Sequence, residues 1–123
     1  ASSSLEKVRM AIERHGTTQR YSDICAYGNT IYLVETPQTL DANVATQTRE
    51  VLAGVEKLLE QAGSDKTRLL MVTIYLRDID DAIAVNAVWD RWVPRGTAPA
   101  RICVEAKLAH HDFLLEVAVI AAR

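Results

Sequence analysis

The residues best suited to chemistry are an arginine and a glutamate in neighbouring segments near the C-terminus. Arg101 opens an expected strand in which it shares one face with Cys103. Glu116 lies inside an apolar run, where burial would raise the pKa of its carboxyl group and suit it to proton transfer near neutral pH. Because a guanidinium binds a planar carboxylate bidentately, the pair predicts a site at which a small acid is hydrolysed.

The geometry expected for this pair follows from the two segments that carry it. Residues 100–108 and 113–122 both have the pattern of strands, and the short polar segment between them predicts a hairpin. In such a hairpin Arg101 and Glu116 would face the same pocket. The same residue types also fit a structural ion pair, or side chains that point to solvent from an antiparallel edge.

Other reactive residue types give weaker indications of a site. Cys103 has no histidine that the sequence places to activate it, so a buried and inert thiol is predicted there. His110 and His111 precede Asp112 in a polar turn, and adjacent side chains in a turn are expected to point apart. We therefore predict a solvated loop and no metal site.

The elements that must position these residues follow the order ββαβαββ. They are expected as strands at 21–27 and 30–34, a helix at 44–62, a strand at 69–76, a second helix after Asp78, and strands at 100–108 and 113–122. Gly28-Asn29 suits the positive φ angles of a tight hairpin turn between the first two strands. Asp41 and Asp78 are the expected helix caps, and Gly63 is placed to end the first helix.

Two further segments have distinct patterns. Trp89 and Trp92 have the i, i+3 spacing of one helical face, which predicts core or interface anchors. Residues 1–15 have an ambiguous pattern that fits a short helix, a frayed end or an edge strand. Residues 1–11 are accordingly expected to form a flexible or short helical N-terminal extension.

This order predicts an α+β fold in which residues 1–123 form a single domain and two helices cover one face of a mixed sheet. The other face of the sheet still needs cover. A small domain with a partly apolar, uncovered sheet face commonly buries that face against copies of itself. The organisation therefore predicts a homo-oligomer.

Length, composition and charge exclude several classes of protein. The chain has 123 residues and a formal net charge of -2, and its 14 basic residues are scattered without the stripe that binds a nucleic-acid backbone. No apolar run approaches the roughly 20 residues of a membrane helix, and no signal pattern is seen. We expect a cytoplasmic protein with two reduced cysteines and no nucleic-acid or membrane partner.

Several motifs together resemble the Rid family, the YjgF-type reactive imine and enamine deaminases. Pro99-Ala100-Arg101-Ile102-Cys103-Val104 looks like the family's Pro-x-Arg-x-x-Val core. Its trailing glutamate corresponds to Glu116, at a separation (116 − 101 = 15) that agrees with the family. Tyr21-Ser22 and Val85-Asn86-Ala87-Val88-Trp89 resemble two further motifs, and the similarity spans about residues 12–122.

The resemblance implies a chorismate-mutase-like fold in a homotrimer with ligand sites between subunits, and it implies a short strand at 12–14. Members of the best-studied branch hydrolyse 2-aminoacrylate-type enamines and imines to 2-oxo acids and ammonia without a cofactor. By that resemblance Arg101 would hold the substrate carboxylate and Glu116 would activate water. Cys103 would line the pocket, and Tyr21 would close it.

One departure from the family pattern bears on function. Where the active branch has Ser-Gly, this chain has Val34-Glu35, and the extra carboxylate would repel an acidic substrate or pair with Arg101. A less characterised Rid subgroup resembles this chain more closely in Val34-Glu35-Thr36-Pro37, in Leu40-Asp41-Ala42 and in the segment from Trp89 to Trp92. The alternative to a deaminase is a non-catalytic binder of small carboxylates that acts as a sensor or regulator. A ribonuclease suits neither the net charge nor the scattered basic residues.

Overall fold

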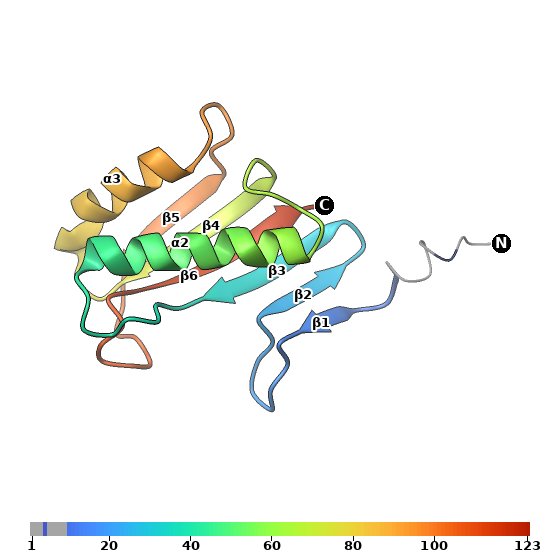
Figure 1. The fold of residues 1–123 in the computed structure, drawn as a ribbon, viewed down its shortest axis with the longest axis horizontal. Helices are drawn as coiled ribbons and strands as arrows, with labels where there is room; N and C mark the ends of the chain where they lie inside the picture. Colours follow the sequence, from blue (N-terminus) through green and yellow to red (C-terminus); the bar gives the residue numbers. More distant parts are fainter. Residues whose placement is uncertain (1–3, 5–9) are drawn as a thin grey trace.

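The computed structural model describes residue 4 and residues 10–123, which form six strands and two α-helices (Figure 1). In chain order the elements are β1 (Glu13–His15), β2 (Ile24–Tyr27), β3 (Thr30–Glu35), α2 (Val44–Gln61), β4 (Leu69–Leu76), the 3-10 helix η1 (Ile79–Asp81), α3 (Ala82–Trp92), β5 (Ala100–Glu105) and β6 (Leu115–Ala122). The predicted ββαβαββ order is therefore preceded by one more strand. That strand overlaps the one implied by the family resemblance at 12–14, whereas most of the expected extension at 1–11 lies outside the described residues.

The six strands form one mixed sheet in the order β1-β2-β3-β6-β4-β5. β4 and β5 run parallel, and every other neighbouring pair is antiparallel. The predicted hairpin between the last two strands is wrong, because β4 lies between β5 and β6. Two parallel neighbours need a crossover connection, and α3 provides it between β4 and β5.

The predicted N-terminal hairpin is confirmed. β2 and β3 pair with Tyr27 opposite Thr30, and the two residues between them form the turn. Gly28 has a φ of 62°, in the left-handed region that glycine adopts at little cost, whereas Asn29 has no positive φ. Of the two turn residues, only Gly28 therefore adopts a positive φ angle.

The long helix α2 is confirmed close to its expected range of 44–62, but its predicted N-cap is wrong. Asn43, rather than Asp41, is the N-cap, and its side-chain oxygen accepts a hydrogen bond of 2.9 Å from the N–H of Thr46. Gly63 follows the C-cap with a φ of 82°, as expected of a residue that ends a helix. The cap lies two residues later than the sequence pattern indicated.

The second helical segment begins as a 3-10 turn and continues as α3. The Asp78 side chain caps η1 by accepting a hydrogen bond of 2.9 Å from the N–H of Asp80. α3 ends at Trp92, before Pro94. As predicted, Trp89 and Trp92 are core anchors: Trp89 is buried, and Trp92 packs partly buried against the core. Their indole rings lie against each other, with centroids 5.6 Å apart.

The molecule has two layers, with α2 and α3 side by side over one face of the sheet (Figure 1). Alternate strand residues point to this helix side and are buried, such as Val72 and Ile74 on β4 and Val117 on β6. The opposite side, called here the open face, carries exposed apolar residues that include Tyr32, Val34, Ile102 and Val104. The prediction that two helices cover one face is confirmed, and in a single chain β4 is buried on that face only.

Gln47 is a fully buried polar residue of α2 that ties two loops together. Its side-chain amide donates to the carbonyl oxygens of Thr39 and Asp112 at 3.2 and 3.0 Å. Its carbonyl oxygen accepts from the N–H of Leu114 at 2.8 Å. Because a buried polar group costs free energy unless it is hydrogen-bonded, this network fixes the segment that leads into β6.

Candidate functional site

The guanidinium of Arg101 is held from two sides by α3. Nη2 donates a hydrogen bond of 2.8 Å to Oδ1 of Asn86. The ring of Trp89 lies beside Cζ, at 5.1 Å from the ring centroid, which is within the range of a cation–π contact. Arg101 therefore has a defined position within one chain, on the helix side of the sheet.

This arrangement, called here the Arg101 region, leaves part of the guanidinium available. Nη1 of Arg101 is buried and has no hydrogen-bond partner among the described residues. No carboxylate of the described residues lies within 4.0 Å of the guanidinium. A cavity of about 310 Å³ adjoins it and is lined by Asn86, Trp89, Asp90, Ala98, Pro99 and Arg101. An unpaired and partly desolvated guanidinium is suited to bind an anion.

Glu116 has different surroundings. It lies on β6 opposite Tyr75 of β4. A cavity of about 590 Å³, called here the Glu116 cavity, is lined by Tyr21, Asp23, Val34, Glu35, Thr36, Tyr75, Ala109, Phe113, Glu116, Val117 and Ala118. The cavity therefore combines carboxyl and phenol groups with an apolar wall, and these groups can exchange protons with a bound molecule.

Arg101 and Glu116 point to opposite faces of the sheet in one chain. Arg101 pairs with Val72, which is buried beneath the helices. Glu116 alternates with the buried Leu115 and Val117, so its side chain points to the open face. The shared pocket expected from a hairpin is thus not formed within one chain, because the intervening β4 and the strand alternation separate the two groups.

Glu35 lies at the end of β3 with its carboxylate against α2. A Cβ atom on Gly54 would lie 2.5 Å from Oε2 of Glu35, so a larger residue at position 54 would displace the Glu35 carboxylate. Burial raises the pKa of the Glu35 carboxyl above its ordinary value, a hydrogen bond from the N–H of Thr36 lowers it, and the charge of Asp23 raises it further. Of the two alternatives for Glu35, the ion pair with Arg101 is not formed within the described residues.

The other predicted site residues are divided between the two regions. Cys103 shares the helix-side face of Arg101, as predicted, and packs partly buried against the core. Tyr21 is 58% exposed in the loop before β2 and lines the Glu116 cavity. The chain therefore groups Arg101 with Cys103, and Glu116 with Tyr21. Glu35 also lines the Glu116 cavity, but its carboxylate points to α2.

Two residues that hold Arg101 were not predicted to have that role. Asn86 and Trp89 are three positions apart on α3 and so lie on one helical face. A signal was present, because asparagine is a poor helix former and its amide offers both donors and an acceptor for hydrogen bonds. The sequence could not supply the partner, since the contact depends on how α3 packs over β5.

The His110-His111 turn differs from its expected form. The two imidazole rings are stacked, with centroids 5.0 Å apart, rather than pointing apart. His110 also stacks on Phe113, which lines the Glu116 cavity. Within the described ranges, no group of three or more His, Cys, Asp or Glu side chains could hold a metal ion.

Neither of the two described α-helices is long and apolar enough to cross a membrane.

Comparisons with known proteins give a consistent set of relatives. A family model described as Endoribonuclease L-PSP matches residues 11–123. The RutC family protein YoaB of Escherichia coli is 39% identical over 113 residues, covering 92% of this chain and 99% of YoaB. A RutC family protein of Haemophilus influenzae is 37% identical and covers 91% of this chain and 98% of its own.

Solved structures agree with these sequence relatives. A member of the YjgF protein family from Neisseria meningitidis superposes with a TM-score of 0.88 at 40% identity, over 94% of this chain and 97% of that one. YyfA of the Rid protein family from Yersinia pestis gives 0.80 at 27% identity, over 87% and 90% of the two chains. Residues 11–123, which the family model matches, include all the elements that carry the candidate site.

Proposed function

The chain belongs to the Rid/YjgF family, and on that premise we propose that it is a cofactor-independent deaminase of small 2-imino acids of the 2-aminoacrylate type. The observation that carries the proposal is the guanidinium of Arg101, which α3 holds in place with one buried nitrogen unpaired. Such a group favours a carboxylate ligand, which every 2-imino acid contains.

The proposed site is composite and lies between copies of the chain. Arg101 lies on β5, the edge strand of the sheet, whereas Glu116 faces the open side near the middle of the sheet. One chain cannot bring the two groups to a single small ligand. A neighbouring copy whose β5 edge meets the open face would do so, and the exposed apolar residues of that face favour such burial. We propose a homotrimer, the assembly that the family resemblance implies.

In this mechanism Arg101 holds the substrate carboxylate and Glu116 handles the protons. Glu116 accepts a proton from a water molecule as the oxygen attacks the imine carbon, and a C–O bond forms. Glu116 passes this proton to the nitrogen, which gives a carbinolamine. The hydroxyl proton of the carbinolamine then transfers to the amino group, the C–N bond breaks as the C=O bond forms, and ammonia leaves together with a 2-oxo acid. An enamine substrate must first take a proton on carbon to become the imine.

The remaining site residues have proposed supporting roles. Tyr21 would close the cavity over the substrate, and Cys103 would line the pocket beside Arg101. The Glu35 carboxylate lies against α2 and is not neutralised by Arg101. Its negative charge would therefore weaken the binding of acids. Water and these side chains supply all the atoms of the reaction, and no metal or cofactor takes part.

Mixing two inactive variants tests the composite site. Arg101→Ala and Glu116→Gln should each lack turnover of freshly generated 2-iminopropanoate. When the two are unfolded and refolded together, random assembly should give native Arg101 and Glu116 at about a quarter of the sites. Recovery of activity supports the composite site, whereas a mixture as inactive as either variant, or a monomer by light scattering, contradicts it. Wild type refolded in the same way is the control.

The second candidate function is a non-catalytic binder of small carboxylates. The separation of the Arg101 region from Glu116 within one chain favours it, because anion binding by Arg101 needs no carboxylic acid nearby. The binder hypothesis would be supported if the wild-type protein binds 2-oxobutanoate but does not hydrolyse imines faster than they hydrolyse spontaneously in water. The family model's description names an endoribonuclease, but a net charge of -2 with scattered basic residues does not suit an RNA substrate.

A further inference from the structure

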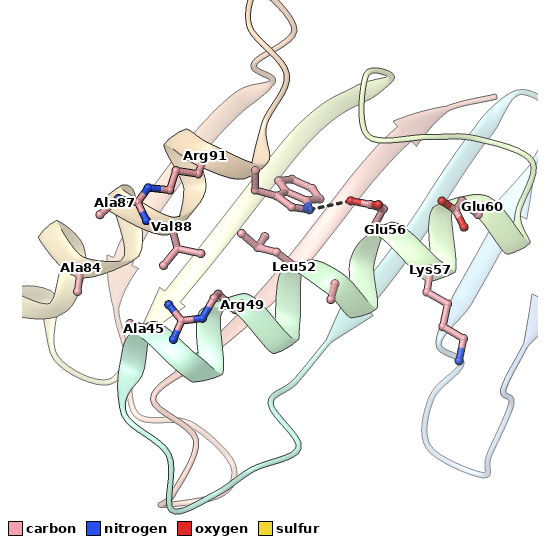
Figure 2. Close-up of a pocket in the computed structure, with 12 residues that line it drawn as sticks. Ala45, Arg49, Leu52, Glu56, Lys57, Glu60, Ala84, Ala87, Val88 and Arg91 are labelled. Atoms are coloured by element: carbon pink, nitrogen blue, oxygen red, sulfur yellow. Dashed lines mark hydrogen bonds between the residues drawn. The ribbon is translucent and has the colours of Figure 1, made fainter.

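Outside the proposed site, a groove lies between α2 and α3, on the side of the helices that faces away from the sheet (Figure 2). Its volume is about 650 Å³, within the range of roughly 300–1,000 Å³ that is common for small-molecule sites. It does not include Arg101 or Glu116 among its lining residues. The groove is therefore a separate feature of the helical layer.

Small side chains on both helices produce this groove. Ala53 on α2 and Ala87 on α3 are exposed and line it, and their methyl groups leave the space between the helices unfilled. Larger apolar side chains, those of Leu52, Val88 and Trp92, form its walls. The lining is thus mostly apolar, which suits a ligand with an apolar body.

The charges of the groove are not balanced. Arg49 on α2 and Arg91 on α3 extend to the same end of the groove in Figure 2, on either side of Val88. Arg49 donates to the hydroxyl of Thr46 at 3.1 Å. In the part of the chain that the structure describes, no carboxylate lies within 4.0 Å of either guanidinium. Two cations from different helices are therefore left without an acidic partner.

The acidic residues lie toward the other end, and one of them is already neutralised. Glu56 accepts a hydrogen bond of 3.1 Å from Nε1 of Trp92 and lies 3.2 Å from Nζ of Lys66. Glu60 also lines the groove, three positions after Lys57, whose side chain extends away from α3 in Figure 2. The end formed by the two arginines is consequently the one that attracts an anion.

We propose that this groove binds a small organic anion with an apolar body, such as an arylcarboxylate. The carboxylate would lie between Arg49 and Arg91, where charge-assisted hydrogen bonds are strong. The ring system would lie against Leu52, Val88 and Trp92. Neither the family resemblance nor the proposed deaminase reaction requires this site, so the two proposals stand or fall separately.

The test is a titration of the ¹⁵N-labelled full chain with 2-naphthoate, followed by NMR. The indole N–H of Trp92 lines the groove, and the chain has only two tryptophans, so its signal is a specific reporter. We expect a saturable shift of this signal and of the amides of Ala53 and Ala87. The neutral 2-naphthamide should bind about tenfold more weakly, since it lacks the charge. No saturable shift at millimolar 2-naphthoate would overturn the proposal.

Matched variants assign the binding to the groove. The double variant Arg49→Gln/Arg91→Gln should weaken 2-naphthoate binding about tenfold or more. The control is the double variant Arg20→Gln/Arg95→Gln, which changes two exposed arginines outside the groove and should leave the affinity unchanged. Equal affinity in both double variants would overturn the proposal.

Two further variants separate the groove from the Arg101 region. Ala53→Phe fills the groove without changing its charge and should abolish binding. Because 2-naphthoate is a carboxylate, Arg101→Ala should retain its binding in the groove, and loss of the Trp92 shift in that variant would instead assign the binding to the Arg101 region. Circular dichroism checks that each variant is folded.

Discussion

The Arg101 region and the Glu116 cavity differ in how much of each region a single chain completes. In the Arg101 region, one hydrogen bond and one aromatic ring fix the guanidinium before any ligand arrives. In the Glu116 cavity, the carboxylate lies among loop residues and on a sheet face whose apolar side chains remain exposed. Under the proposed function, binding of the acid is built into each chain, whereas the chemistry depends on assembly.

This difference has an energetic reason. A guanidinium that is already positioned loses little conformational entropy when it binds a carboxylate. A cavity open to water leaves Glu116 hydrated, and exclusion of water strengthens electrostatic interactions and proton transfer. A second copy over the open face would supply that exclusion.

Glu116→Gln should have the largest effect, and on rate alone. The amide keeps the shape of the side chain but cannot carry the proton, so the rate of imine hydrolysis should fall about a hundred- to ten-thousandfold. Affinity for the product 2-oxobutanoate, measured by calorimetry, should stay nearly unchanged because Arg101 is intact. Ammonia release from freshly generated 2-iminobutanoate measures the rate. A variant as fast as a catalytically active wild type would contradict the role of Glu116.

Arg101→Ala should have the next largest effect, and on affinity. Loss of the bidentate charge-assisted contact should weaken 2-oxobutanoate binding about a hundredfold. Arg101→Lys keeps the charge but not the planar fork, so a loss of about tenfold is expected. Arg95→Ala, at an exposed arginine outside the cavity, is the control. If calorimetry gives the same affinity for wild type and Arg101→Ala, the anion site lies elsewhere.

Asn86→Ala should have an intermediate effect because Asn86 positions Arg101 without being proposed to touch the ligand. Loss of the 2.8 Å hydrogen bond frees the guanidinium to move, and binding of 2-oxobutanoate should weaken about tenfold. In steady-state kinetics KM should rise more than kcat falls, since the proton-transfer group is unaffected. A fall in kcat at constant KM would assign Asn86 to the chemical step instead.

Glu35→Gln should have the smallest effect, on the pH dependence of stability. Burial raises the pKa of Glu35 in the folded chain, so its favourable contribution is present at low pH and is lost as the pH rises through the folded-state pKa. The amide does not titrate. The free energy of unfolding of the variant, relative to wild type, should therefore increase between pH 4 and pH 7 in urea titrations. A constant difference across this range would show that burial of the charge has no net cost.

Local features of this fold could be predicted from the sequence because they depend on near neighbours. The bounds of β4 match the apolar run at 69–76, and the β2–β3 turn lies at Gly28-Asn29, as the pattern indicated. Strand alternation correctly placed Arg101 and Cys103 on one face. The cap of α2 was misplaced because Asp41 and Asn43 are both good capping residues, and only the backbone geometry decides between them.

The sequence by itself determined the family, the identity of the candidate groups, and most of the strands and helices, since motifs and periodicity are local properties of the chain. The tertiary structure decided which strands are neighbours. β4 lies between β5 and β6, and this places Arg101 beneath the helices and Glu116 on the open face. The strand–helix–strand order from β4 to β5 was a signal for a parallel crossover. The side chains that contact Arg101 are determined by the packing of α3 against the sheet. This packing brings together residues that are distant in the sequence, and local periodicity does not specify it.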